Sequence, residues 1–279
     1  MKNVLEWLEA TVAKYPDKPA FSDTESSITF RQVYDIARNT GAYLVEQLGV
    51  DRNPVAVFAG RKMVTPAYFL GVVYAGRPYA PIDASLPDKR IEKILENLCP
   101  RAIVADRESL EHVESIVDEL AKAEGFDRPQ IFIAEDISHF EQVSCADSNC
   151  KISESAGDSV TDSENDMLAT VRRQMSMTDP LYIIYTSGST GNPKGVMTSH
   201  LSLMTYINAY CDVMHIEESD VLGNQSPLDY IAAIRDIYLP LKTGCSTAII
   251  PKEYFMEPNA LFDYMNDKKV SSVGWSVSA

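Results

Sequence analysis

Short runs of apolar residues alternate with segments of helical periodicity along most of the chain. Residues 55–59 form a continuous apolar run, which is typical of a strand buried on both faces of a parallel sheet. Residues 3–14 instead repeat their apolar positions at helical spacing, and Pro16 ends that pattern. This alternation predicts helices layered around a largely parallel sheet, the α/β class.

The same patterns give the expected elements of the whole chain. Helices are predicted at 3–14, 31–48, 65–74, 87–98, 108–123, 201–213, 231–241 and 259–266. Strands are predicted at 20–22, 27–29, 55–59, 79–82, 102–105, 130–134, 181–185, 196–198, 221–224, 247–250 and 272–277. Gly49 directly follows one predicted helix, as expected at a helix C-terminus. Tyr206, Tyr210 and Met214 are four residues apart, and we expect them to face the sheet.

Residues 135–166 interrupt this pattern, because they are rich in Ser, Asp, Glu and Asn and show little apolar periodicity. Such a segment buries too little apolar surface to offset the entropy lost on ordering it. We therefore predict an acidic, flexible linker between a first α/β unit at 1–134 and a second at 167–279. A regulatory phosphorylation tract is the alternative, and only the serines support it.

The net charge of −15, from 25 basic and 40 acidic residues, disfavours nucleic acids and anionic membranes as partners. Basic residues occur at most in pairs such as Arg61-Lys62, which we interpret as solvated. No uncharged stretch approaches the roughly 20 residues of a membrane helix, and the N-terminus is unlike a signal peptide. The five cysteines form no disulfide or zinc pattern, and Cys145 and Cys150 near His139 lack a fourth metal ligand. These features predict a cytoplasmic protein with no metal site of its own.

The segment after the strand at 181–185 carries the strongest chemical pattern in the sequence. It consists of Thr186, Ser187, Gly188, Ser189, Thr190, Gly191, Asn192, Pro193, Lys194 and Gly195. Glycines allow backbone amides to approach an anion, hydroxyl groups can donate to phosphate oxygens, and lysine supplies a positive charge. A triphosphate is the natural ligand for such a loop. The spacing differs from the G-x-x-x-x-G-K-[ST] loop of nucleoside triphosphatases, and a plain Ser/Gly turn is the alternative.

This loop also resembles a known family. The string YTSGSTGNPKGVMTSH (185–200) resembles the phosphate loop of the adenylate-forming, or AMP-binding, superfamily. That superfamily includes acyl-CoA synthetases, firefly luciferase and the adenylation domains of nonribosomal peptide synthetases. Residues 28–44, 71–106 and 224–244 resemble further motifs of the family in the same order. The segment at 71–106 is similar to nonribosomal peptide synthetase adenylation domains and to D-alanine–carrier-protein ligases.

The resemblance implies a fold of stacked α/β sheet units from the N-terminal domain of these enzymes, with the second unit incomplete. It implies that ATP, with Mg²⁺, activates a small carboxylate, more favourably an amino acid, to an acyl-adenylate with release of pyrophosphate. Thr186–Gly191 and Lys194 would hold the β- and γ-phosphates. The usual acceptor would be the phosphopantetheine thiol of a carrier protein, or CoA. An aryl- or acyl-acid ligase and a non-catalytic nucleotide-binding module remain as alternatives.

The substrate pocket departs from the pattern of the family. The amino-acid-activating branch has an Asp that pairs with the substrate ammonium, and an ungapped alignment places Ile231 there, preceded by Tyr230. Asp229 lies two residues before Ile231 and could replace that Asp only if the backbone shifts. Isoleucine cannot pair with an ammonium group, and an unpaired buried charge is costly. Either Asp229 enters the pocket, or the substrate lacks an amino group there, or these are ordinary loop residues.

The catalytic residues cannot be assigned, because the lysine that assists adenylate formation in the family has no counterpart before Ala279. The adenine-contacting and ribose-binding motifs are missing as well. We therefore expect this chain to be a fragment with little activity alone. His200 follows the loop, and we expect a structural hydrogen bond there rather than a general base.

Overall fold

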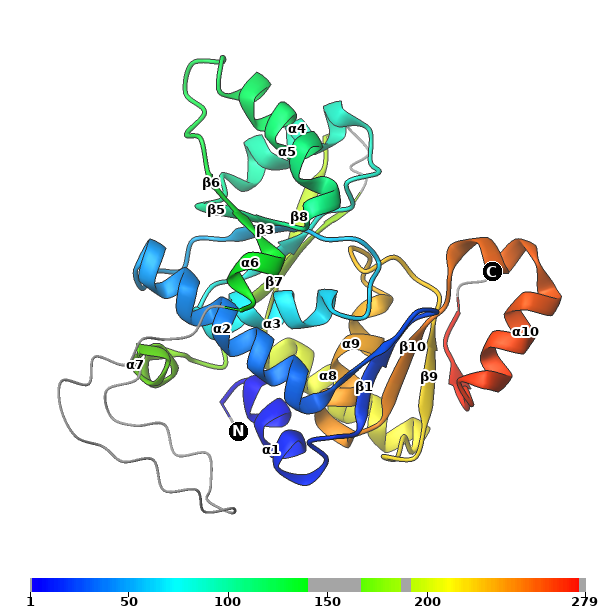
Figure 1. Ribbon diagram of the computed structural model, residues 1–279. Coiled ribbons are helices and arrows are strands. Elements are labelled where there is room, and N and C mark those ends of the chain that lie inside the picture. Colours follow the sequence, from blue (N-terminus) through cyan, green and yellow to red (C-terminus); the bar gives the residue numbers. More distant parts are fainter. Residues whose placement is uncertain (1, 140–166, 187–191, 276–279) are drawn as a thin grey trace.

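Two sheets flanked by helices form the body of the protein in the computed structural model, which describes residues 2–139, 167–186 and 192–275 (Figure 1). One sheet has six strands in the order β6-β5-β3-β4-β7-β8, and only β8 is antiparallel to its neighbour. Its strands are β3 (Val55–Phe58), β4 (Tyr79–Pro81), β5 (Ala102–Ala105), β6 (Gln130–Ile133), β7 (Pro180–Thr186) and β8 (Lys194–Ser199).

The second sheet has five strands in the order β11-β9-β10-β1-β2, with only the β1–β2 pair antiparallel. They are β1 (Pro19–Ser22), β2 (Ser27–Thr29), β9 (Val221–Asn224), β10 (Ser246–Ile249) and β11 (Ser272–Val273). Both sheets therefore combine strands from the two sides of the 135–166 segment. The mixed α/β class with two mainly parallel sheets agrees with the predicted fold, whereas the domain boundaries at 134 and 167 stay a prediction.

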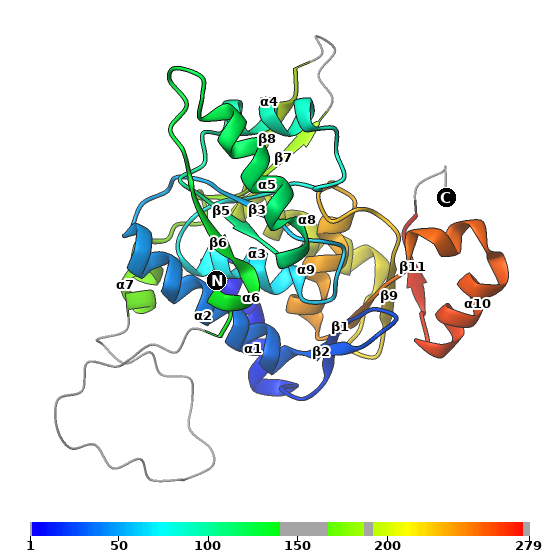
Figure 2. The ribbon, with the colours of Figure 1, turned by 45° about the horizontal axis from the view of Figure 1, so that its top comes forward.

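The helices cover both faces of these sheets (Figure 2). They are α1 (Leu5–Lys14), α2 (Phe30–Leu48), α3 (Thr65–Tyr74), α4 (Asp88–Leu98), α5 (Arg107–Leu120), α6 (Ala134–Ile137), α7 (Met167–Gln174), α8 (His200–Met214), α9 (Ala233–Thr243), the 3₁₀ turn η1 (Lys252–Met256) and α10 (Pro258–Asp267). All eight predicted helices are present. The alternation along β3 explains the layers, because Ala56 and Phe58 pack with α4 and α5 while Val55 and Val57 face the core that contains α2 and α3.

Local sequence signals account for several helix ends. Thr29 and Gln32 form a reciprocal capping box at the start of α2, and Gly49 ends that helix at a φ of 70°. The structure differs from the sequence pattern at α6 and α7, which were not predicted. Contacts with distant residues hold both helices: Arg107 binds Glu135 and Asp136, and Arg172 forms a two-fold ion pair with Glu9.

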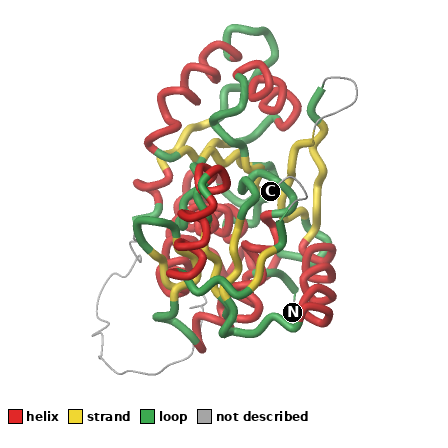
Figure 3. Tube along the Cα trace, turned by 90° about the vertical axis from the view of Figure 1, so that its right-hand side faces the viewer, coloured by secondary structure: helices red, strands yellow, loops and turns green. Residues whose placement is uncertain are grey.

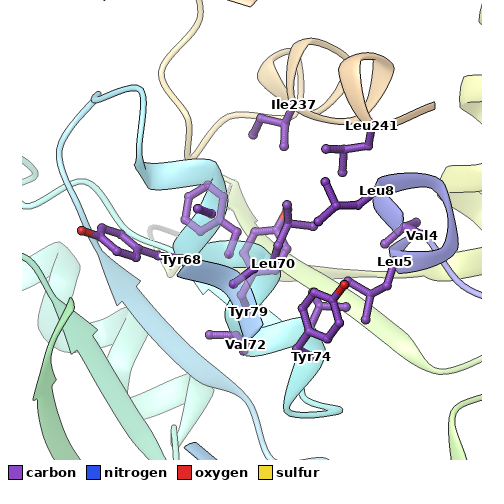
Figure 4. Close-up of a cluster of buried hydrophobic side chains, with 14 of the residues drawn as sticks. Val4, Leu5, Leu8, Tyr68, Leu70, Val72, Tyr74, Tyr79, Ile237 and Leu241 are labelled. Atoms are coloured by element: carbon purple, nitrogen blue, oxygen red, sulfur yellow. The ribbon is translucent and has the colours of Figure 1, made fainter. Parts of the chain in front are cut away.

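The main core lies between the two sheets and joins them (Figure 4). Its side chains come from α1, α3, β4 and α9, and they include Leu5, Leu8, Leu70, Tyr79, Ile237 and Leu241. The hydroxyls of Tyr79 and Tyr238, both fully buried, lie 3.2 Å apart and link β4 of the six-stranded sheet to α9. Because one core supports both sheets, the loops at their carboxyl ends are held in a fixed relation.

Helix α8 corrects one expectation. Tyr206 and Met214 are 48% and 47% exposed, so they do not face the sheet as predicted. The buried side of α8 carries Leu203, Met204 and Ile207 instead. None of the helices in the described ranges has the length and apolar character required to span a bilayer.

Candidate functional site

A β-hairpin carries the predicted phosphate loop at the edge of the six-stranded sheet (Figure 3). Strand β7 is buried from Leu181 to Ile184, and the chain then leaves the core. Thr186 at the end of β7 pairs with Lys194 at the start of β8, and the Thr186 hydroxyl lies 3.5 Å from the Lys194 carbonyl oxygen. Both residues are exposed. The hairpin thus presents the two described ends of the predicted loop to solvent, while Ser187, Gly188, Ser189, Thr190 and Gly191 lie outside the described residues.

A cleft of about 1190 Å³ opens where the carboxyl ends of β3 and β4 meet those of β9 and β10. Its charged lining residues include Asp23, Arg61, Lys62, Asp83, Asp229 and Glu253. Open α/β sheets bind ligands at the carboxyl ends of their strands. Strands β4 and β7 are parallel neighbours, with Tyr79 opposite Tyr182. The carboxyl end of β7, which leads into the predicted phosphate loop, therefore lies at the same end of the sheet as the carboxyl end of β4.

Asp229 is the only one of the three predicted pocket residues that lines this cleft in the described part of the chain. Burial, and then the neighbouring charge of Asp83, raise the pKa of Asp229 above its usual value. Tyr230 and Ile231 lie just before α9 and are 53% and 49% exposed. The structure therefore brings Asp229, and not Ile231, to the cleft wall.

Two cations that the sequence pattern assigns to a solvated surface belong to the same cleft. Arg61 follows β3 and donates from one terminal nitrogen to the Asn224 carbonyl oxygen (2.7 Å) and side-chain oxygen (2.9 Å). Asn224 is fully buried and donates to Asp236 at 3.0 Å. Burial lowers the pKa of Arg61 to about 10, and the charge of Asp236 opposes that effect. Arg61 lies three residues after the buried parallel strand β3. Because ligand sites form at the carboxyl ends of such strands, this position could have predicted that Arg61 lies at the cleft.

Lys62, the second cation, forms ion pairs with two carboxylates at the end of β5 and the start of α5. Its ammonium group lies 2.9 Å from Glu108 and 3.3 Å from Asp106. Burial alone would lower the pKa of Lys62, but the hydrogen bond to Glu108 and the charge of Asp106 raise it. Asp106 also caps α5 by accepting the Ser109 N–H at 2.9 Å. Lys62 therefore remains a charged lysine held at the wall of the cleft.

His200 has the structural role that we expected. It is 1% exposed, and its Nδ1 atom accepts the Val4 N–H at 3.4 Å. Burial lowers the pKa of His200 to about 4. Ser199, the residue before it, caps α8 by accepting the Ser202 N–H. The ring is thus a neutral acceptor that ties α8 to the start of α1.

No group of three or more His, Cys, Asp or Glu side chains suited to hold a metal ion occurs within residues 2–139, 167–186 and 192–275. Cys145 and Cys150 lie outside these ranges. Mg²⁺ that accompanies a nucleotide commonly takes its ligands from phosphate oxygens and water, with one or two carboxylates. Asp83 at the cleft is such a carboxylate, so the lining is compatible with a nucleotide-bound magnesium ion.

Comparison with known proteins gives concordant results. The model of the AMP-binding enzyme family matches residues 8–275. A D-alanine–D-alanyl carrier protein ligase of Bacillus licheniformis is 27% identical over 266 residues, which cover 94% of this chain and 46% of the relative. The corresponding ligase of Bacillus velezensis is 26% identical over 258 residues, covering 92% and 44%. The chain therefore spans about half the length of the curated relatives it matches.

Solved structures show the same fold. A four-domain nonribosomal peptide synthetase bound to AMP and glycine superposes with a TM-score of 0.72 at 19% identity. That match covers 97% of this chain and 17% of the synthetase chain. VinN in complex with 3-methylaspartate superposes with a TM-score of 0.70 at 15% identity, covering 98% and 66%. Both structures share the α/β fold of this chain.

Proposed function

The chain belongs to the AMP-binding enzyme family, and from that premise we propose that the complete protein activates a small carboxylate with ATP. The carrying observation is that β7, which leads into the predicted phosphate loop, runs parallel to β4, and a cleft of about 1190 Å³ lies at the carboxyl ends of β4 and its neighbours. A cavity of this size at the same end of the strands as a phosphate site can hold a nucleotide and a small acid together. The ligase relatives and the AMP- and amino-acid-bound neighbours support this reaction class.

The reaction requires two anions to be held in contact. A carboxylate oxygen attacks the α-phosphorus of ATP and forms a new P–O bond. The bond from the α-phosphorus to the oxygen that bridges to the β-phosphate breaks, and pyrophosphate leaves with that electron pair. We assign Thr186–Gly191 and Lys194 to the β- and γ-phosphates, where hydroxyl, amide and ammonium donors would offset the charge of the leaving group. Mg²⁺ would enter with the nucleotide and neutralise further phosphate charge.

We further propose that the substrate is an amino acid and that Asp229 binds its ammonium group. Asp229 lines the cleft close to Asp83, and both carboxylates give this part of the wall a negative charge. Burial and the charge of Asp83 raise the pKa of Asp229 although Arg90 opposes them, so a further cation at this carboxylate would be electrostatically favourable. A bound ammonium group would place a positive charge beside this carboxylate and lower the pKa of Asp229 again. The half-exposed, apolar Ile231 favours the alternative of an aryl- or acyl-acid ligase, since that substrate needs no anionic partner.

The acceptor for the activated acyl group would be a thiol. D-alanyl carrier protein ligases are among the similar proteins, so a phosphopantetheine-bearing carrier protein is the acceptor that we propose first, with CoA as the alternative. Transfer of the acyl group from the adenylate to each purified acceptor, followed by mass spectrometry, distinguishes the two.

ATP–pyrophosphate exchange tests the reaction itself. The complete protein is incubated with labelled pyrophosphate, Mg·ATP and a panel of amino acids and simple carboxylic acids. Exchange that depends on one of these acids is the expected result. ATP binding without exchange for any acid would instead support a nucleotide-binding module.

The substitution Lys194→Ala tests whether Lys194 binds the phosphates of ATP. Because Lys194 is exposed at the start of β8, the substitution should weaken ATP binding by about 10-fold without changing the unfolding transition. A variant that binds ATP like the wild type would remove Lys194 from the site. A broadened unfolding transition would show that Lys194 is structural.

A further inference from the structure

Helix α4, which is distant in sequence from the phosphate loop, contacts the hairpin formed by β7 and β8 (Figure 2). Tyr185, the second-last residue of β7, donates its hydroxyl proton to Oδ1 of Asn97 on α4 at 2.8 Å. Burial raises the pKa of Tyr185 to about 12, so the hydroxyl stays protonated and acts as the donor. The strand that leads into the loop is thereby attached to α4.

A second contact joins α4 to the other arm of the hairpin. Lys93 donates to Oδ1 of Asn192 at 3.2 Å, and Asn192 is two residues before Lys194. Lys93 and Asn97 are four residues apart and therefore lie on one face of α4. One face of a single helix thus contacts the residue before the loop and a residue near its end.

The packing of Gly195 adds an independent observation. Gly195 pairs with Tyr185 across the hairpin. A Cβ atom at Gly195 would lie 3.1 Å from Cζ of Tyr185 and 2.9 Å from Cγ2 of Ile183, so neither side chain leaves space for one. The Tyr185 ring therefore packs against Gly195, the residue directly after Lys194. Because Asn97 holds the hydroxyl of that ring, the position of the Lys194 backbone is linked to α4.

We propose that Asn97 and Lys93 of α4 are positioning residues of the nucleotide site, which hold the two arms of the hairpin so that Thr186 and Lys194 face the phosphates of ATP. This proposal rests on the proposed function of the loop. Tyr185 transmits the contact with Asn97, and Asn192 transmits the contact with Lys93. A polyphosphate is the ligand class that the positioned hydroxyl and ammonium groups would recognise.

Hydrogen–deuterium exchange tests the attachment without any ligand. The variants are Tyr185→Phe, which keeps the ring, Asn97→Ala, and the double variant. Loss of one hydrogen bond should speed amide exchange in residues 192–199 about fivefold in each single variant. The double variant should exchange no faster than either single variant, because both remove the same interaction. Wild-type exchange in both single variants would overturn the proposal.

Binding of Mg·ATP, measured by calorimetry, tests the consequence for the nucleotide site. Lys93→Ala and Lys89→Ala each remove one lysine from α4, but only Lys93 contacts the hairpin in the described structure. We expect Lys93→Ala and Asn97→Ala to weaken Mg·ATP binding about fivefold, and Lys89→Ala to leave it within twofold. Equal effects of Lys93→Ala and Lys89→Ala would reduce the role of Lys93 to general charge and contradict the proposal.

The two measurements keep the proposals separate. If the wild-type protein binds no Mg·ATP, the proposed function of the loop fails, and the exchange data alone decide whether α4 holds the hairpin. If the wild type binds Mg·ATP and the exchange variants bind it equally well, α4 does not position the site. A rise in KM for ATP at constant kcat in the complete protein would further support a positioning role, since general destabilisation would not produce it.

Discussion

The stability of this protein should depend on the protonation state of His200. The side chain is 1% exposed, and its Nδ1 atom accepts the Val4 N–H. A protonated imidazole has no lone pair for this contact, so protonation both breaks the hydrogen bond and leaves a buried charge. Burial lowers the pKa of His200 to about 4, and the neighbouring charges of Asp179, Arg172 and Arg52 act more weakly.

The sign and size of the effect follow from linkage. The folded pKa lies below the unfolded value of about 6.5, so the stabilisation is complete above pH 6.5 and is lost as the pH falls toward 4. The full difference corresponds to about 3 kcal/mol of unfolding free energy. At pH 5.5 the loss should be about 1.4 kcal/mol, which is large enough to measure.

Urea unfolding at pH 7.5 and pH 5.5, followed by tryptophan fluorescence, compares the wild type with His200→Asn. The asparagine Oδ1 atom can still accept the Val4 N–H but does not titrate. Carboxylates that titrate in this range affect both proteins equally, so the stability of the wild type should fall by about 1.4 kcal/mol more than that of the variant. His112→Asn, on the exposed surface of α5, controls for the change of residue type. Parallel loss of stability in the wild type and His200→Asn would refute the reasoning.

Three further substitutions probe packing, an ion pair and the pocket. A Cβ atom at Gly71 would lie 2.5 Å from Thr40, so Gly71→Ala should destabilise the α2–α3 contact by about 1–3 kcal/mol in urea unfolding; an unchanged midpoint would show that the helices can separate freely. Glu9→Gln should cost about 2 kcal/mol and speed amide exchange in α7, because Glu9 binds both terminal nitrogens of Arg172 at 2.6 and 3.0 Å; exchange unchanged in α7 would contradict this. Asp229→Ala in the complete enzyme should raise KM for amino acids but not for acids without an amine, and unchanged amino-acid activation would exclude Asp229 as the anchor.

Local patterns were sufficient to predict the elements but not their order in the sheets. The runs at 55–58 and 102–105 are apolar throughout because these strands are buried on both faces. Sequence alone does not place β1 next to β10, because that pairing joins segments at the two ends of the chain. The helices α6 and α7 were missed for a related reason: their anchors, Arg107 and Glu9, are distant in sequence.

The error in α8 has a simple geometric cause. Residues three or four apart on a helix share a face. Helix α8 contains one such series with Tyr206 and Tyr210, and a second with Leu203, Met204 and Ile207. Periodicity identifies both as continuous stripes and cannot choose between them. The structure buries the aliphatic stripe. The ring centroids of Tyr206 and Tyr210 lie 6.1 Å apart, and Cζ of Arg235 lies 5.6 Å from the centroid of the Tyr210 ring.

The loop motif could be predicted better than its surroundings. Thr186 and Lys194 occupy the exposed ends of a hairpin, as the phosphate-loop assignment requires, and their roles toward phosphate stay a prediction. Arg61 was assigned to solvent because an isolated basic pair carries no pattern. Its place in the cleft depends on Asn224 of β9, in the other sheet, and on Asp236 of α9, which binds Asn224.

Gly195 shows why a motif can be identified without its physical reason being known. Sequence reasoning explains glycines in such a loop by close approach of the backbone to phosphate. In the structure, a Cβ atom at Gly195 would instead meet Tyr185 and Ile183 of the paired strand. The same tyrosine donates its hydroxyl to Asn97 on α4. A glycine at this position is therefore required by packing within the hairpin, and that packing connects the residue after Lys194 to a helix some 100 residues earlier in the chain. A motif glycine can thus be explained by packing within the scaffold rather than by direct contact with a ligand.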